Sequence, residues 1–500
     1  RYAAPVEGAE LEAANYDQKL YFHELGTAQE ADKLVYERPD HKTWRFGPVV
    51  SEDGRYLVLE VSQSSDERNL VFYRDLSEPT SPVVELLTEY DADYSFLGND
   101  GSTFYFYTTN AAPRGRVIAI DTKNPAKENW KELVPQAAET LESVSLVGDR
   151  FIGSYLKDVR SLVKVFELSG KLAREVELPG LGAATGFGGK RADKESFYTF
   201  ASFTSPTSVY RYDIESGASE IFRASKLSFD PSQYVTEQIF YTSKDKTRVP
   251  MFLTHKKGLA KNGKNPTLLY GYGGFNQSMT PGFNPARIAW MERGGIFAVA
   301  NLRGGGEYGE EWHAAGTKLH KQNVFDDFIA AAEWLIAEKY TSTPKLAIQG
   351  GSNGGLLVGA AITQRPELFG AALPAVGVMD MLRFHKFTIG HAWTSDYGSS
   401  DDPEEFKALR AYSPYHNLRA GTCYPPTMVT TADHDDRVVP AHSFKFAAEL
   451  QHDQACANPV LIRIDVRAGH GAGKPTAKVI DQHTDEMAFI LKALGESSAP

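Results

Sequence analysis

The chain has 500 residues, of which 42% are hydrophobic and 23% are charged, and that much apolar surface excludes a wholly disordered protein. The length predicts roughly two to four domains, because a single hydrophobic core stops growing at about 250–300 residues. The 53 basic and 64 acidic residues give a net charge of −11 without a concentrated basic patch, which argues against nucleic acid and membrane surfaces as partners.

Two features bear on the location of the protein: the lack of a long apolar run and the presence of only two cysteines. No apolar run approaches the roughly 18 residues of a membrane-spanning helix. Cys423 and Cys456 have no CxxC spacing, so we expect two ordinary thiols rather than a disulfide scaffold, a zinc site or a redox pair. This low cysteine usage favours the cytoplasm. A periplasmic or secreted location stays open, because the chain begins at Arg1 rather than at Met.

The first half of the chain, up to about residue 226, alternates short β-rich runs with turns of Gly, Asp, Asn and Pro. The Asp53-Gly54 and Asp100-Gly101 pairs supply the positive φ that tight hairpins need, and they lack the ligand pattern of a calcium loop. Repeated four-strand units predict a β-propeller over residues 1–226. Strands are predicted, among others, at residues 20–24, 56–61, 70–73, 103–108, 117–121, 151–156, 162–168, 196–200 and 208–213.

The second half, residues 227–500, alternates strands with longer helical patterns, which predicts an α/β domain with a mostly parallel sheet. Residues 267–270 and 296–301 read as buried strands, and residues 324–339 carry apolar side chains at helical spacing. Residues 345–349 form the next predicted strand, which runs directly into a glycine-rich segment.

That segment contains the strongest motif in the chain, Gly-x-Ser-x-Gly centred on Ser352. A strand before it and a predicted helix after it are typical of a nucleophile elbow, where the serine occupies a strained turn that only small neighbours tolerate. Gly350 and Gly354 meet this need. The elbow presents the hydroxyl group at the carboxyl end of the strand and aims backbone NH groups at a reacting carbonyl group.

A serine nucleophile needs a carboxylate and an imidazole base, which follow the serine in this order in α/β-hydrolases. After Ser352, a predicted strand at residues 427–431 leads into a polar loop with three candidate acids. Spacing does not choose among Asp433, Asp435 and Asp436.

The candidate base follows the last predicted strand, residues 461–466. His470 has a glycine on either side and lies at the same edge of the sheet as the candidate acids. His434 competes for this role, but its place within the acidic loop suits a bystander better than a base.

No metal or organic cofactor is expected. Residues 304–309 fit GxGxxG, but no strand with a terminal acidic residue follows about 20 positions later, as a dinucleotide site requires. Residues 469–474 have the wrong glycine spacing for a phosphate loop, and Pro475 stands where Ser or Thr would bind the metal.

Five motifs follow one another in the second half: YGYGGF (270–275), NLRGGGEYG (301–309), GGSNGGL (350–356), ADHDDRVVP (432–440) and GHGAGKP (469–475). They closely resemble those of the prolyl oligopeptidase family, in that family's order, and the first half resembles its β-propeller more loosely. The resemblance implies that Ser352 is the nucleophile, Asp435 the orienting acid and His470 the base. It also implies an oxyanion hole made by the Tyr272 hydroxyl group and the Asn353 backbone NH.

The same resemblance implies a pocket for proline, whose ring offers no NH and is recognised by its faces. Trp393 would lie against the ring and Arg437 would bind a substrate carbonyl group. No acidic cluster stands near these positions, which argues against cleavage after Lys or Arg. The remaining lining residues would be Phe275, Val378, Tyr397 and Val438.

We therefore expect a monomeric serine endopeptidase that hydrolyses short peptides on the carboxyl side of proline. The alternatives are a macrocyclase that uses the same acyl-enzyme, a propeller-based binding protein with a disabled hydrolase module, and, less favoured, an esterase. Family members usually carry additional N-terminal sequence, so residues 1–226 would supply about five of seven blades. The chain would then be either a fragment or a shortened member.

Overall fold

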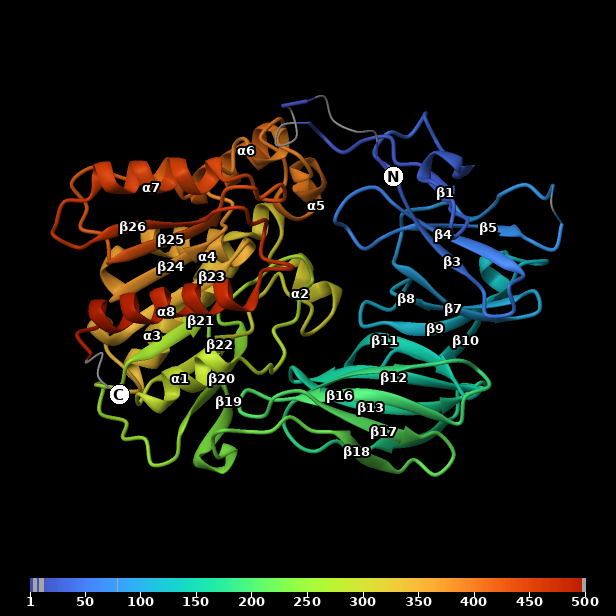
Figure 1. The fold of residues 1–500 in the computed structure, drawn as a ribbon, viewed down its shortest axis with the longest axis horizontal. Coiled ribbons are helices and arrows are strands. Elements are labelled where there is room, and N and C mark those ends of the chain that lie inside the picture. Colours follow the sequence, from blue (N-terminus) through green and yellow to red (C-terminus); the bar gives the residue numbers. More distant parts are fainter. Residues whose placement is uncertain (3–6, 9–12, 79, 497–500) are drawn as a thin grey trace. The chain divides into compact units, whose positions relative to one another are not determined.

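The structure is a computed structural model that describes residues 1–2, 7–8, 13–78 and 80–496. The chain divides into two compact units (Figure 1). The first comprises Arg1–Ala201, Thr207–Ser225 and Tyr308–Glu310, and the second comprises Ser202–Pro206, Lys226–Glu307 and Glu311–Pro500.

The first unit contains four antiparallel four-stranded sheets, each built from consecutive strands, as expected for propeller blades. Among the described residues, β1 (Leu20–Phe22) and β2 (Lys33–Tyr36) form only a two-stranded sheet, so the predicted five blades become four whole ones and this pair. The blades are β3 to β6 (Arg45–Val50, Tyr56–Ser62, Leu70–Asp75, Val84–Leu87), β7 to β10 (Tyr94–Asp100, Thr103–Thr108, Arg116–Asp121, Lys131–Val134), β11 to β14 (Thr140–Val147, Arg150–Lys157, Arg160–Glu167, Leu172–Val176) and β15 to β18 (Ala183–Gly188, Glu195–Ala201, Ser208–Asp213, Ser219–Arg223).

Successive blades pack face to face through alternate side chains of their strands. Val58 and Val71 of the first blade share a buried cluster with Phe104 and Ile118 of the second. The predicted hairpin at Asp53-Gly54 is confirmed, because Gly54 has a φ of 71° between two paired strands.

The second unit is built on an eight-stranded sheet in the order β19-β20-β22-β21-β23-β24-β25-β26, parallel from β22 onward. The α/β prediction is therefore confirmed. The strands are β19 (Tyr234–Thr242), β20 (Arg248–Lys256), β21 (Thr267–Tyr270), β22 (Ile296–Ala300), β23 (Leu346–Gly351), β24 (Ala371–Ala375), β25 (Thr427–Ala432) and β26 (Val460–Asp465). The helices are α1 (Pro285–Glu292), α2 (Glu310–Ala314), α3 (Gln322–Ala337), α4 (Asn353–Gln364), α5 (Thr394–Tyr397), α6 (Pro403–Tyr412), α7 (Ala441–Asp453) and α8 (Thr476–Ala493).

Helices cover both faces of this sheet (Figure 1). Ile348 of β23 belongs to the buried cluster that includes residues of α3 and α4. The next residue, Gln349, accepts a hydrogen bond from Arg287 of α1 and donates one to Glu486 of α8. Because successive side chains of a strand point to opposite faces, the two helix pairs lie on opposite sides of the sheet.

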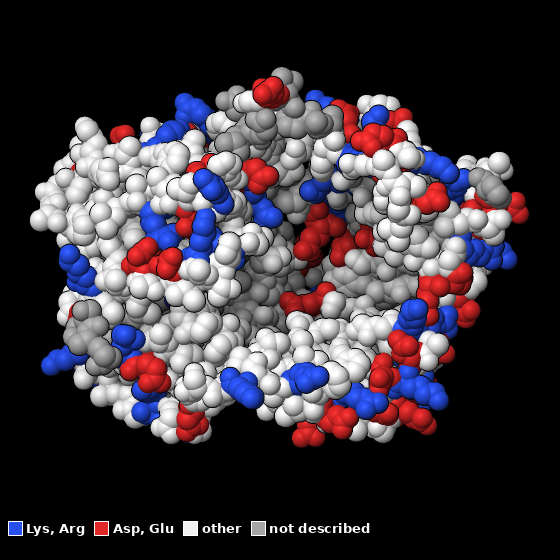
Figure 2. Space-filling model, viewed as in Figure 1, with Lys and Arg blue, Asp and Glu red and all other residues white. Residues whose placement is uncertain are grey.

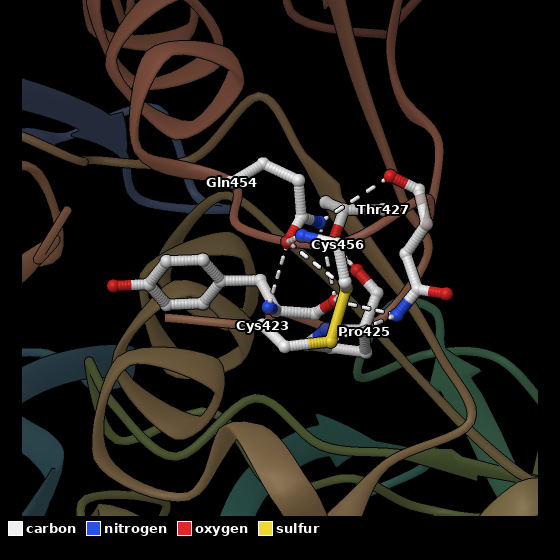
Figure 3. Close-up of a disulfide and its surroundings, with 7 residues drawn as sticks. Cys423, Pro425, Thr427, Gln454 and Cys456 are labelled. Atoms are coloured by element: carbon white, nitrogen blue, oxygen red, sulfur yellow. Dashed lines mark hydrogen bonds between the residues drawn. A yellow bond between two sulfur atoms is a disulfide. The ribbon is translucent and has the colours of Figure 1, made fainter. Parts of the chain in front are cut away.

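Cys423 and Cys456 form a disulfide, so the prediction of two ordinary thiols is wrong. Their Cα atoms are 5.2 Å apart, within the usual range for a disulfide. The contact is not visible in the sequence because the two segments meet only through the sheet: Cys423 precedes β25, and Cys456 precedes its neighbour β26. Gln454 accepts a hydrogen bond from the backbone NH of Tyr424 beside the bridge (Figure 3).

Surface charges of both signs are interspersed on the face shown in Figure 2, and no extended basic patch is visible among the described residues there. This agrees with the acidic net charge of −11. Within the described part of the chain, none of the helices combines the length and the apolar character needed to cross a membrane.

Candidate active site

Ser352 lies in a sharp turn between β23 and α4, as the elbow motif predicts. Its φ of 58° and ψ of −117° lie outside the regions that side-chain-bearing residues usually adopt. The Ser352 backbone NH donates to Ala375 O at 2.8 Å, which fixes the turn against β24. The strain is therefore held by the sheet, and the side chain lines a cavity.

The glycines around Ser352 are required by close packing. A Cβ atom on Gly350 would lie 2.3 Å from the carbonyl oxygen of Gly354, and one on Gly354 would lie 2.7 Å from that of Gly271. Both distances are far below van der Waals contact. The elbow thus packs against Gly271, which directly follows β21. The next residue, Tyr272, therefore lies close to the serine.

Asp435 and His470 form the second part of the site. Asp435 follows β25, His470 follows β26, and Nδ1 of His470 lies 2.7 Å from Oδ2 of Asp435. The other carboxylate oxygen, Oδ1, accepts hydrogen bonds from the backbone NH groups of Arg437 at 3.0 Å and Val438 at 2.9 Å. The carboxylate is fully buried, and these three contacts compensate its lost hydration.

The other candidates in the acidic loop are placed differently. Asp433 pairs with His434, whose side chain is 72% exposed, and this interaction lowers the pKa of Asp433. Asp436 is exposed. Of the three aspartates that spacing leaves open, Asp435 is the one that is buried and bound to His470.

No hydrogen bond joins Ser352 to His470 in the described part of the chain. Hydrogen bonds of this kind are often long without substrate and shorten in the reacting complex. Both residues lie in loops at the carboxyl edge of the parallel strands, where active sites of such sheets form.

Tyr272 lies beside the serine. Burial, followed by the negative charge of Asp396, raises the pKa of the Tyr272 hydroxyl group to about 12, and the side chain of Ser352 opposes this with a smaller effect. Asn353 begins α4, where backbone NH groups lack intrahelical partners. Its side chain donates to Tyr272 O at 2.6 Å and accepts from the Tyr397 hydroxyl group at 2.9 Å. The Asn353 side chain thereby ties the backbone of Tyr272 and the hydroxyl group of Tyr397 to the start of α4.

A cavity of about 530 Å³ opens beside Ser352. Its lining is mainly apolar and contains no Asp or Glu among the described residues. Of the predicted site residues it includes Tyr272, Phe275, Ser352, Val378, Trp393, Tyr397, Arg437 and Val438. Tyr270, Gln277, Met279 and Ile389 also line it; the sequence prediction missed them, although Gln277 and Met279 closely follow the YGYGGF motif.

The aromatic walls of the cavity support one another. Phe384 stacks behind Trp393 with ring centroids 6.3 Å apart and planes 13° apart. Phe275 meets Tyr397 edge to face at 5.2 Å. Such contacts restrict the rings, so the cavity offers a flat apolar slot suited to a small ring.

One group among the described residues has the geometry to hold a metal ion. Glu449, His452 and Asp453 of α7 place their ligand atoms within 4.8 Å of one another. None of them is among the predicted site residues, and His452 already binds Asp453 at 3.0 Å. We assign no metal to this group.

Comparisons with known proteins give matches to both halves of the chain. A model of the Prolyl oligopeptidase family matches residues 281–497, and a model of its N-terminal beta-propeller domain matches residues 1–225. The Prolyl endopeptidase of Elizabethkingia meningoseptica is 47% identical over 498 residues, which cover 99% of this chain and 70% of that protein.

Solved structures give the same result. A structure from a study of two prolyl endopeptidases matches with a TM-score of 0.92 and 44% identity, over 96% of this chain and 70% of that one. Prolyl oligopeptidase B from Galerina marginata, bound to a 25mer macrocyclization substrate, matches with a TM-score of 0.95 and 38% identity, over 100% of this chain and 71% of that one.

Proposed function

The chain belongs to the prolyl oligopeptidase family of serine peptidases, and on that premise we propose how its residues hydrolyse peptides on the carboxyl side of proline. The observation that carries the proposal is the 2.7 Å contact between buried Asp435 and His470, at the same sheet edge as the strained Ser352. The cavity beside the serine has the apolar walls that a proline ring requires.

The reaction begins with attack of Ser352 Oγ on the carbonyl carbon of the prolyl residue. Nε2 of His470 accepts the hydroxyl proton, while Asp435 holds Nδ1–H and stabilises the imidazolium. The Tyr272 hydroxyl group and the Asn353 backbone NH donate to the oxyanion. His470 then protonates the leaving amine, and water, activated by the same imidazole, hydrolyses the acyl-enzyme.

Substrate selection follows from the cavity. Trp393 would lie against one face of the proline ring, with Phe275 and Val378 among the other walls. Arg437 is exposed and lines the same cavity, where its guanidinium could donate to a substrate carbonyl group. A cationic side chain would find no carboxylate in the described lining. The restriction to short peptides is a prediction from the sequence.

The direct test is Ser352→Ala. We expect this variant to fold and bind a prolyl peptide but to cleave none, and we expect the wild type to react with a fluorophosphonate probe. Ser77→Ala, a change in an exposed turn of the first unit, is the matched control and should keep full activity. Cleavage by Ser352→Ala would refute the assignment. A wild type that neither labels nor cleaves would favour the binding-protein alternative.

A macrocyclase is the second candidate, favoured by the match to a structure with a macrocyclization substrate. An incoming amine would replace water as the acceptor of the acyl group. Mass spectrometry of the products from a long proline-containing peptide separates the two reactions, because a cyclic product has lost one water relative to the linear peptide.

The disulfide bears on the compartment. Cysteine usage favours the cytoplasm, but disulfides persist mainly in oxidising compartments. We therefore propose a periplasmic or secreted location, tested by blocking free thiols in intact cells and measuring whether Cys423 and Cys456 react.

The monomeric state expected from the sequence is a separate proposal, tested by sedimentation of the purified protein.

A further inference from the structure

The oxyanion loop, residues 271–277, is held by two buried charged side chains from other elements. Nζ of Lys321 donates a hydrogen bond to Gly273 O at 3.0 Å. The Phe275 backbone NH donates to Oδ2 of Asp396 at 2.9 Å. The loop backbone on either side of Gly274 is thus fixed by one cation and one anion.

These two side chains form a buried ion pair. Nζ of Lys321 lies 3.9 Å from Oδ1 of Asp396, and the two side chains are 1% and 3% exposed. Oδ1 of Asp396 has no hydrogen-bond partner among the described residues and faces Lys321, while Nε2 of His313 lies 3.9 Å from Oδ2 of the same carboxylate. The ammonium group also lies 5.2 Å from the ring centre of Tyr397. Such a pair is retained at a high desolvation cost, and removal of Lys321 leaves the buried Asp396 with His313 as its remaining nearby basic side chain.

The loop needs this support because its backbone is strained. Phe275 has a φ of 55° and Asn276 a φ of 53°, in the left-handed region that residues with side chains rarely adopt. Such conformations persist only when neighbouring contacts determine them. The hydrogen bond from Phe275 to Asp396 is one of these contacts.

The same pair connects the loop to the wall of the cavity. Asp396 lies in α5, between Trp393 and Tyr397, and Lys321 immediately precedes α3. A shift of Asp396 would therefore displace two segments at once: the loop that carries Tyr272 and helix α5, which follows Trp393.

We propose that Lys321 and Asp396 are positioning residues, which hold the oxyanion loop so that the Tyr272 hydroxyl group stays aimed at the carbonyl that Ser352 attacks. The proposal rests on the proposed function, since it assigns Tyr272 to the oxyanion hole. Neither charged group contacts substrate in this scheme. Both act through the position of the phenol.

The test is a double-mutant cycle on the full chain, with kcat and KM measured on a prolyl peptide. Lys321→Met preserves length and removes the charge, and we expect kcat to fall about 10- to 100-fold with KM changed less than about threefold, since one oxyanion donor is worth about 10²- to 10³-fold. In a Tyr272→Phe background the same change should lower kcat by less than about threefold, because the effects of two residues that act through one another are not additive.

Asp396→Asn provides a second route if Lys321→Met does not fold, because asparagine has the same shape and still offers an acceptor to Phe275 NH. It should give the same pattern. Asp326→Asn is the matched control: Asp326 lies in α3 and pairs with Lys244 at the surface, so its loss should leave kcat unchanged.

Equal losses in the wild-type and Tyr272→Phe backgrounds would show a general structural effect and overturn the positioning role. So would a folded Lys321→Met variant with wild-type kcat. A wild-type chain that cleaves no prolyl peptide would instead remove the proposed function itself, so the two failures are distinguishable.

Discussion

Asp435 and His470 are 35 positions apart in the chain, yet Oδ2 of Asp435 lies 2.7 Å from Nδ1 of His470. The contact exists because β25 and β26 are parallel neighbours in the sheet, so the loops after them leave the sheet at the same edge. A buried carboxylate at this distance favours the proton on Nδ1. The other ring nitrogen, Nε2, is then free to accept a proton from Ser352.

Asp435→Asn tests this tautomer argument. The amide keeps the size of the carboxylate but can present its NH₂ group to Nδ1, which stabilises the wrong tautomer and removes the negative charge. We expect kcat to fall about 10⁴-fold. Steady-state kinetics on a prolyl peptide give the value, and an unchanged melting temperature shows that the fold is intact.

Two neighbours in the same loop serve as controls. Asp433→Asn and Asp436→Asn change a partner of exposed His434 and an exposed side chain, respectively. Both should retain activity within about threefold, because Asp436→Asn is a surface change and Asp433→Asn keeps an oxygen that can accept from the Ala468 backbone NH. A loss at Asp433 that matches the loss at Asp435 would contradict the assignment of the acid.

Tyr272→Phe tests the oxyanion hole. Removal of the hydroxyl group deletes one donor and leaves the buried ring in place, so we expect kcat to fall about 10²- to 10³-fold with little change in KM. Tyr270→Phe is the matched control, because its ring lines the same cavity but is not assigned a donor role. A Tyr272→Phe variant with wild-type kcat would exclude the phenol as a donor.

The raised pKa of Tyr272 gives a pH prediction for the same variant. Burial raises this pKa to about 12, and the protonated form, which donates, is fully populated below the pKa. The ratio of wild-type to Tyr272→Phe kcat should therefore stay constant up to about pH 10. A phenol with the ordinary pKa near 10 would lose half of this advantage at that pH.

Much of the fold could be predicted from local patterns. Residues 267–270 and 208–213 form strands with the predicted bounds, because the first is a short buried apolar run and the second alternates, with Tyr210 and Tyr212 packed into a core cluster. The predicted helix at 324–339 begins two residues earlier and ends at Ala337, since Lys339 adopts a φ of 59° that ends the helix. The outermost strand β18 is exposed throughout, so no burial pattern marks it.

The residues of the site could be predicted from the sequence only in part. The elbow around Ser352 could be predicted because its glycines and strained serine are neighbours in the chain. The choice of Asp435 among three aspartates needed the resemblance or the structure, because it depends on which side chain faces His470 across the sheet. No sequence pattern pointed to Lys321, because its role depends on its contact with Gly273 of the oxyanion loop, 48 positions away in the chain.

Trp393→Ala tests the reading of the cavity. Loss of the indole removes one flat wall, and an apolar pocket typically discriminates by about 10- to 200-fold. We expect kcat/KM for a prolyl substrate to fall by this factor while that for the matched alanyl substrate changes little. Trp393→Phe keeps a flat face and should retain most of the preference. Equal losses on both substrates would argue against contact between Trp393 and the proline ring.

The disulfide allows a prediction that separates stability from catalysis. Cys423 and Cys456 are 33 positions apart and join the segments that enter β25 and β26, whereas Asp435 and His470 leave the opposite ends of these strands. Closing a loop of this length constrains the unfolded chain and stabilises the fold by about 3–4 kcal/mol. Cys423→Ser with Cys456→Ser should therefore lower the melting temperature but keep kcat at 25 °C within about twofold, since surface and remote changes leave an intact site unaffected. Reduction of the wild type should lower its melting temperature to that of the double variant and leave the variant unaffected. A large loss of kcat at a temperature where the variant is fully folded would show instead that the bridge helps to align the acid and the base.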